Sequence, residues 1–118
     1  MNILIFATLA EFSLISEVFK NTYDNINCIH ATDNEVMLCE LAKGNADIAI
    51  ISVDGALGME IAISVRSIDT DIPLILFSND IHFGPQAYRL DCNYFSGKPV
   101  TKSRLITAMH RISSTARI

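Results

Sequence analysis

The stretch Asp47-Ile48-Ala49-Ile50-Ile51-Ser52 predicts a β-strand that is covered on both faces. The residues from Ile48 to Ile51 are all apolar and do not alternate with polar ones. Such a run is typical of a parallel strand between two layers of helices, because both faces of the sheet are then buried. The run Ile72-Pro73-Leu74-Ile75-Leu76-Phe77-Ser78 has the same character, with its proline near the start, where a missing N–H costs least. Together the two runs predict a parallel sheet.

Strand and helix patterns alternate along the rest of the chain. The segment Thr32-Asp33-Asn34-Glu35 matches a capping box, in which threonine and glutamate side chains bond the free amides of a helix start. Gly44 supplies a stop for that helix. Repeats of strand then helix, joined by short loops, predict an α/β fold with a doubly wound parallel sheet in a single domain, residues 1–118. We predict strands over 2–6, 25–30, 47–52, 72–78 and 93–96, and helices over 9–20, 32–42, 58–68, 85–90 and 101–113.

Composition and charge exclude several classes of protein. Half of the 118 residues are hydrophobic and 19% are charged, which argues against disorder. A formal net charge of −4 disfavours a dominant role in binding nucleic acid. No apolar stretch reaches the ~20 residues that a membrane span requires. The start of the chain lacks the basic residues and long apolar core of a signal peptide, so we expect a cytoplasmic protein.

The three cysteines, Cys28, Cys39 and Cys92, form no C-x-x-C pair. An odd number in a reducing compartment indicates free thiols. Cys28 and His30 would share a strand face, so a zinc site with a third ligand is conceivable. Half-buried cysteines and a strand histidine are the ordinary explanation.

Polar residues follow several of the predicted strands. In doubly wound sheets a ligand site forms outside the carboxyl ends of the strands, which here are Ala7-Thr8, Ser52-Val53-Asp54, Ser78-Asn79 and Ser96-Gly97-Lys98. None of these segments is a glycine-rich phosphate loop, and none pairs a nucleophile with a base. We therefore predict that the protein is not an enzyme. A small enzyme or nucleotide-binding protein on the same kind of sheet is the less favoured alternative, because many functions share this fold.

Three segments give the chain a resemblance to a known family. They are Lys98-Pro99 after the last strand, Ser78 after Ile-Pro-Leu-Ile-Leu-Phe, and Gly58-Met59-Glu60-Ile61-Ala62 at a helix start. Taken together and in their order along the chain, they resemble the receiver domain of bacterial two-component response regulators, over essentially the whole chain from Asn2 to about Ile112. The resemblance implies a flavodoxin-like (βα)5 fold with strand order 2-1-3-4-5.

The family's phosphorylation pocket is only partly retained. In a working receiver, two acids after the first strand and an aspartate after the third bind Mg²⁺, and that aspartate accepts a phosphoryl group. Carried onto this chain, the acidic pair falls at Ala7 and Thr8, and the acceptor falls at Ser52. The family's alcohol and its lysine with the following proline are present as Ser78 and Lys98-Pro99, a peptide bond that the resemblance implies to be cis. Mg²⁺ prefers carboxylate oxygens, so we expect no metal, no cofactor and no phosphorylation, which defines an atypical receiver, or pseudo-receiver.

Asp54 leaves an alternative open. It lies two positions beyond Ser52, in a loop that is about two residues shorter than the family's and lacks its common proline. A receiver that still accepts phosphate on Asp54 in a rearranged site is the runner-up hypothesis.

Lys98 has two expected arrangements in such a pocket. It points to solvent, or it bonds the hydroxyls of Thr8 and Ser52 and nearby carbonyls. Without its usual acidic partners it would also favour an anion, although Asp54 and Asp80 nearby oppose this. Ser78 has a simpler alternative role, which is to cap the end of its own strand.

Protein contact is the expected mode of action. Phe95 falls at the family's switch aromatic position, and we expect it to be locked in one state or to be plain core; Tyr94 should face the opposite side and be open to solvent. Receivers usually dimerise or dock partners through the face of the fourth helix, fifth strand and fifth helix, although an ordinary solvated surface explains any one of its residues equally well. A stand-alone adaptor and the regulatory domain of a transcriptional response regulator with a DNA-binding output domain are both compatible with the polar tail 113–117. On this chain that candidate interaction face comprises Tyr88, Arg89, Asp91, Tyr94, Lys102, Arg104 and Arg111.

Overall fold

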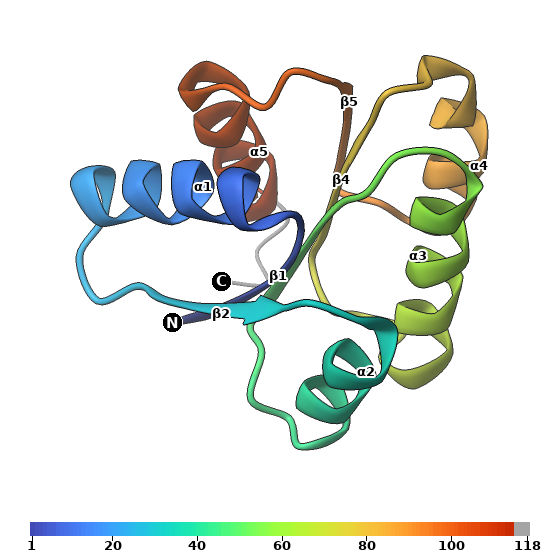
Figure 1. Ribbon diagram of the computed structural model, residues 1–118, viewed down its shortest axis with the longest axis horizontal. Helices are drawn as coiled ribbons and strands as arrows, with labels where there is room; N and C mark the ends of the chain where they lie inside the picture. The colour runs from blue at the N-terminus through green and yellow to red at the C-terminus, as the bar shows by residue number, and fades with distance from the viewer. Residues whose placement is uncertain (115–118) are drawn as a thin grey trace.

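The computed structural model describes residues 1–114, so most of the polar tail, residues 115–117, lies outside the described part. Within it, strands and helices alternate, and the strands form one parallel sheet with the order β2-β1-β3-β4-β5 (Figure 1). The predicted fold class and strand order are confirmed. The elements are β1 (Asn2–Phe6), α1 (Leu9–Thr22), β2 (Asn27–Ala31), α2 (Asn34–Ala42), β3 (Ile48–Ser52), α3 (Ala56–Ile68), β4 (Leu74–Ser78), the 3₁₀ turn η1 (Ile81–Phe83), α4 (Gly84–Arg89), β5 (Tyr94–Gly97) and α5 (Lys102–Ser114).

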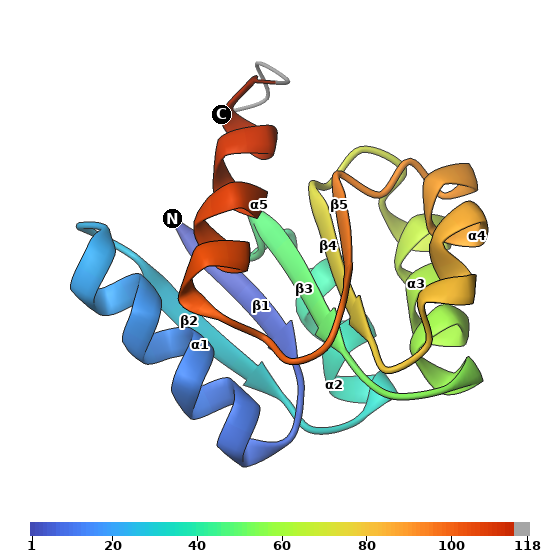
Figure 2. The same ribbon diagram turned by 90° about the horizontal axis from the view of Figure 1, so that it is seen from above.

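Helices cover both faces of the sheet. Helices α1 and α5 lie on one side, and α2, α3 and α4 lie on the other (Figures 1 and 2). Side chains alternate between the layers along each strand: Ile48 and Ile50 pack toward α1 and α5, while Ala49 and Ile51 pack toward α2 and α3. This two-sided burial explains why β3 carries no polar alternation.

The start of α2 differs from the prediction by one residue. The N-cap is Asp33, whose carboxylate accepts the N–H of Val36 at 2.9 Å, so the capping role predicted for Thr32 is wrong. Aspartate is among the strongest N-caps, and here it takes precedence over the neighbouring threonine. Gly44 follows the helix with a φ of +71°, which confirms it as the stop.

A 3₁₀ turn that was not predicted precedes α4. The Asp80 carboxylate accepts the N–H of His82 at 2.9 Å and starts the turn η1, which runs directly into α4. Pro85 lies in the first turn of α4, where its missing N–H has no helical partner to lose.

None of the helices in the described part of the chain is both long and apolar enough to cross a bilayer. All three cysteines are free, as predicted.

Candidate functional site

A small hollow of about 240 Å³ lies at the carboxyl ends of β1, β3 and β5. In Figure 2 the arrowheads of β1 and β3 point to this edge of the sheet. The side chains that line the hollow include Thr8, Ser52, Asp54 and Lys98, together with Glu11 from the first turn of α1. The structure thus brings together predicted residues from the ends of β1, β3 and β5, and adds one that the sequence analysis did not select.

Ser52 is buried at the floor of this hollow, with 1% of its surface exposed. It ends β3 and pairs with Phe77 of β4 in the sheet. The Ser52 hydroxyl donates a hydrogen bond to Glu11 Oε2 at 3.1 Å. The residue at the family's acceptor position is therefore a hydroxyl that is already bonded to a carboxylate.

Lys98 forms two ion pairs inside the hollow. Its Nζ lies 3.1 Å from Glu11 Oε1 and 2.8 Å from Asp54 Oδ1, and its side chain is 20% exposed. Neither expected arrangement of Lys98, in solvent or on the hydroxyls of Thr8 and Ser52, is the one in the structure. Partial burial alone would lower the pKa of the Lys98 ammonium, but the hydrogen bonds to Asp54 and Glu11 outweigh it, so the pKa lies above its ordinary value.

Glu11 is the main residue that the sequence analysis missed. Thr8 caps α1, and its hydroxyl accepts the N–H of Glu11 at 3.2 Å. In a regular capping box the glutamate would bond back to the cap residue's own N–H. Here its carboxylate binds Ser52 and Lys98 instead. The Thr8-x-x-Glu11 spacing could therefore have predicted an acidic residue near the end of β1. Its carboxylate lies in the same hollow as positions 7 and 8, which carry no acid.

The loop after β3 is held from two sides. Asp54 is ion-paired with Lys98, although 58% of its side chain is exposed. The next residue, Gly55, has a φ of +71° and donates its N–H to Asn79 Oδ1 at 2.9 Å. The ion pair and this bond join the β3–α3 loop to the loops that follow β5 and β4.

Ser78 is buried but is not turned toward the hollow. Its hydroxyl accepts the N–H of Asp80 at 3.1 Å, within its own turn, and its carbonyl accepts the N–H of Lys98 at 3.0 Å. Ser78 is not among the residues that line the hollow. This geometry corresponds to the simpler role, in which the serine caps the end of β4.

Arg104 of α5 holds the loop that carries Lys98. Its guanidinium donates to the carbonyls of Gly97 at 2.8 Å and Pro99 at 2.7 Å, one on each side of the lysine. The Lys98-Pro99 peptide bond is cis, as the resemblance implied. Arg104 was predicted as part of an interaction face, but in the structure its guanidinium binds these two main-chain carbonyls.

Phe95 and Tyr94 occupy opposite faces of β5. Phe95 is half-buried, and its ring lies beside Gly84 at the start of α4. Tyr94 is only 8% exposed, because its ring contacts Phe77 edge-on at 6.0 Å and lies under the guanidinium of Arg111, 5.2 Å from the ring centre. The expectation that Tyr94 is open to solvent is wrong, because α5 covers this side of the strand.

Five of the seven residues of the candidate interaction face are exposed, whereas Tyr94 is buried and Arg104 is partly buried. Tyr88 and Arg89 are exposed on α4, and Arg111 is exposed on α5. Lys102 lines a hollow against α1, together with Glu17. Tyr94 is covered and Arg104 is bound to the β5–α5 loop. Asp91 lies in the turn between α4 and β5, where its N–H donates to the Tyr88 carbonyl at 3.0 Å.

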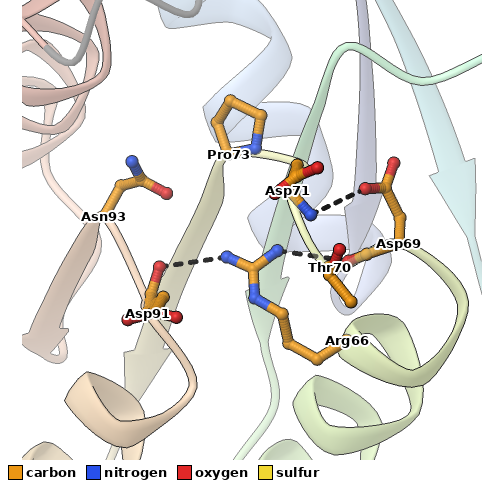
Figure 3. A pocket seen from close by; sticks show the side chains of 7 residues that line it. All are labelled: Arg66, Asp69, Thr70, Asp71, Pro73, Asp91 and Asn93. Carbon is orange, nitrogen blue, oxygen red and sulfur yellow. Dashed lines mark hydrogen bonds between the residues drawn. The ribbon is translucent and has the colours of Figure 1, made fainter.

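A second, polar hollow of about 560 Å³ lies at the amino ends of β4 and β5, and Asp91 is one of the residues that line it (Figure 3). Arg66 crosses it and donates to the carbonyls of Leu90 at 2.6 Å, Ile72 at 2.6 Å and Asp91 at 3.0 Å. These bonds join the end of α3 to the turns before β4 and β5. The guanidinium of Arg66 therefore has a structural role, because it binds main-chain carbonyls of both turns.

The residues present do not fit Mg²⁺. Positions 7, 8 and 52 offer no carboxylate, and both carboxylates of the hollow, from Glu11 and Asp54, face the Lys98 ammonium. Among residues 1–114, no three side chains of His, Cys, Asp or Glu are grouped to hold a metal ion. His30, considered with Cys28 for zinc, has its Nε2 2.8 Å from the Ala7 carbonyl and stacks on Phe12.

Comparisons with known proteins identify the fold. No protein-family model and no curated protein matches the sequence. Solved structures do match: a response regulator receiver protein from Pseudoalteromonas atlantica gives a TM-score of 0.81 at 16% identity, covering 98% of this chain and 99% of the other. A receiver domain protein from Clostridium thermocellum gives 0.80 at 17% identity, covering 98% and 96%. The chemotaxis response regulator CheY4 of Vibrio cholerae gives 0.78 at 16% identity, covering 94% and 97%. The chain therefore has the receiver fold of bacterial response regulators.

Proposed function

We propose that this domain is a receiver-like signalling module that acts without phosphorylation, through contacts with other protein surfaces. One observation carries the proposal: the lysine and the acceptor-position residue of the pocket are both bound to Glu11, a carboxylate of the same chain. The receiver fold of the structural neighbours supports a signalling role. We expect such a module to act in the cytoplasm and to need no cofactor.

The chemistry of the pocket opposes phosphoryl transfer. That reaction depends on a metal ion and cations that offset the negative charge of the incoming phosphoryl group and its acceptor. Here the fixed charge of the hollow is negative by one unit, since Lys98 faces both Glu11 and Asp54. The Glu11 carboxylate that accepts the Ser52 hydroxyl is also paired with the Lys98 ammonium, and Ser52 is almost fully buried.

The exposed part of the candidate face supports protein contact. Tyr88 and Arg89 on α4 and Arg111 on α5 are of the residue types that are enriched at protein interfaces. Such a surface could bind either a second copy of this domain or another signalling protein. Tyr94 and Arg104 do not contribute to this exposed surface, because Tyr94 is covered by α5 and Arg104 is bound to main-chain carbonyls.

Acetyl phosphate tests the proposal against the runner-up. We expect no phosphoryl adduct in the intact mass spectrum after incubation of the domain with acetyl phosphate and Mg²⁺. A working receiver domain treated in parallel serves as the positive control. A stoichiometric phosphoryl adduct would contradict the proposal. Loss of that adduct in either Asp54→Ala or Ser52→Ala would then identify the acceptor.

A further inference from the structure

The contacts of Glu11 have the form of a bound anion. One carboxylate oxygen accepts the hydroxyl of Ser52 and the other accepts the ammonium of Lys98. The two donors come from different strands, β3 and β5, and converge on a group supplied by α1. A hydroxyl and an ammonium that point at the same small volume are a donor pair suited to an oxyanion.

The two carboxylates around Lys98 are not equivalent. The Asp54 side chain is 58% exposed, and the Ser52 hydroxyl donates to Glu11 and not to Asp54. The Glu11 side chain is 24% exposed and binds both donors. Glu11 therefore occupies the position between the donors, whereas Asp54 pairs with the ammonium from the solvent side.

We propose that Glu11 is a tethered anionic ligand of this pocket, an autoinhibitory contact that keeps small oxyanions such as inorganic phosphate away from Ser52 and Lys98. The inference rests on the proposed function, because it explains how a pocket without an acceptor stays closed. A carboxylate anchored by the Thr8 cap at the start of α1 is present at a high effective concentration, which a free anion in solution must exceed. The same contact ties α1 to the loop after β5.

Removing the Glu11 carboxylate is expected to open the site. In Glu11→Ala the two donors lose their internal ligand, and the charge of the hollow changes from −1 to zero. Titration with sodium phosphate, without Mg²⁺ and at constant ionic strength, should then give saturable amide shifts at Ser52 and Lys98. We expect a dissociation constant at least about tenfold below that of the wild type, which has to expel the tethered carboxylate first.

Asp54→Ala is the matched control. It removes one carboxylate partner of the same lysine and changes the charge by the same unit, but it leaves Glu11 between the donors. We expect it to respond to phosphate as the wild type does. Equal binding by Asp54→Ala and Glu11→Ala would overturn the proposal, because charge alone would then explain the gain. A Glu11→Ala protein that melts cooperatively yet shows no saturable shift would also overturn it.

If Glu11→Ala does not fold, Glu11→Gln tests the same point. Its neutral amide keeps the size of the side chain, and we expect phosphate to displace it from Ser52 and Lys98. No phosphodonor is present in this titration, so its failure leaves the phosphorylation-independent function standing. A phosphoryl adduct on the wild type would instead defeat the proposed function without bearing on whether Glu11 excludes phosphate.

Discussion

Replacing Gly58 by alanine is expected to lower the free energy of unfolding by about 2 kcal/mol and to disturb the loop that carries Asp54. Gly58 is buried in the first turn of α3, where an added Cβ would lie 2.5 Å from the carbonyl oxygen of Val53 and 3.4 Å from its carbon. The obstacle is backbone, so no rotation of a side chain relieves it. The loop must move instead, and with it the ion pair between Asp54 and Lys98.

Gly84→Ala is the control for this prediction. Its Cβ would meet the ring of Phe95 at 3.6 Å, an ordinary van der Waals contact, so the stability should change by less than about 1 kcal/mol. Denaturant unfolding of both variants gives the free energies, and the Asp54 and Lys98 amide shifts report on the loop. Equal stability of the two variants would show that the α3 start is not as tightly packed as the structure has it.

Replacing Lys98 by methionine is expected to cost about 2 kcal/mol, because it leaves the partly buried Glu11 carboxylate without its counter-charge. Methionine keeps most of the length of the apolar stem, so the change isolates the ammonium. Lys43→Met is the control: Lys43 pairs with Glu40 at 3.5 Å, but its side chain is 61% exposed. Exposed pairs contribute little, so Lys43→Met should change stability by less than about 0.5 kcal/mol.

The stability lost in Lys98→Met should depend on pH in a set direction. The pKa of Lys98 is raised in the folded state, because its hydrogen bonds to Asp54 and Glu11 favour the charged form. Its contribution is therefore fully present below the pKa of an unfolded lysine, about 10.4, and is lost as the pH rises through the higher folded value. The difference in stability between wild type and Lys98→Met should therefore be constant from neutral pH to about pH 10, and should shrink only as the pH rises further. A gap that persists unchanged in strong base would mean that the ammonium is not its source.

The fold could be predicted from the sequence because its signal is local and repeated. The unbroken apolar run of β3 and the similar run that becomes β4 require a sheet covered on both faces. Errors occur at element ends, where competing caps lie side by side, as Asp33 and Thr32 do before α2. Tyr94 shows a second limit: alternation along β5 gives its side of the sheet, but only the packing of α5 decides whether that side is open.

Only part of the candidate site could be predicted from the sequence. Strand ends locate Ser52, Asp54 and Lys98, because a parallel sheet places them at one edge. The partner of Lys98 depends on how α1 is seated over the sheet, and the two residues are separated by 87 positions in the chain. The Thr8 cap fixes where α1 begins and so directs Glu11 into the hollow. Reading that capping pattern together with the strand ends would have recovered the missing carboxylate.

An amide NMR titration of the wild-type domain, first with Mg²⁺ and then with beryllofluoride as a mimic of the phosphoryl group, tests phosphorylation independence most directly. The ion pairs of Lys98 with Glu11 and Asp54 predict no saturable shift at Ser52, Ser78 or Lys98 with either addition. Saturable shifts that spread from these residues to Phe95 and α5 would contradict this and reveal a working phosphorylation switch.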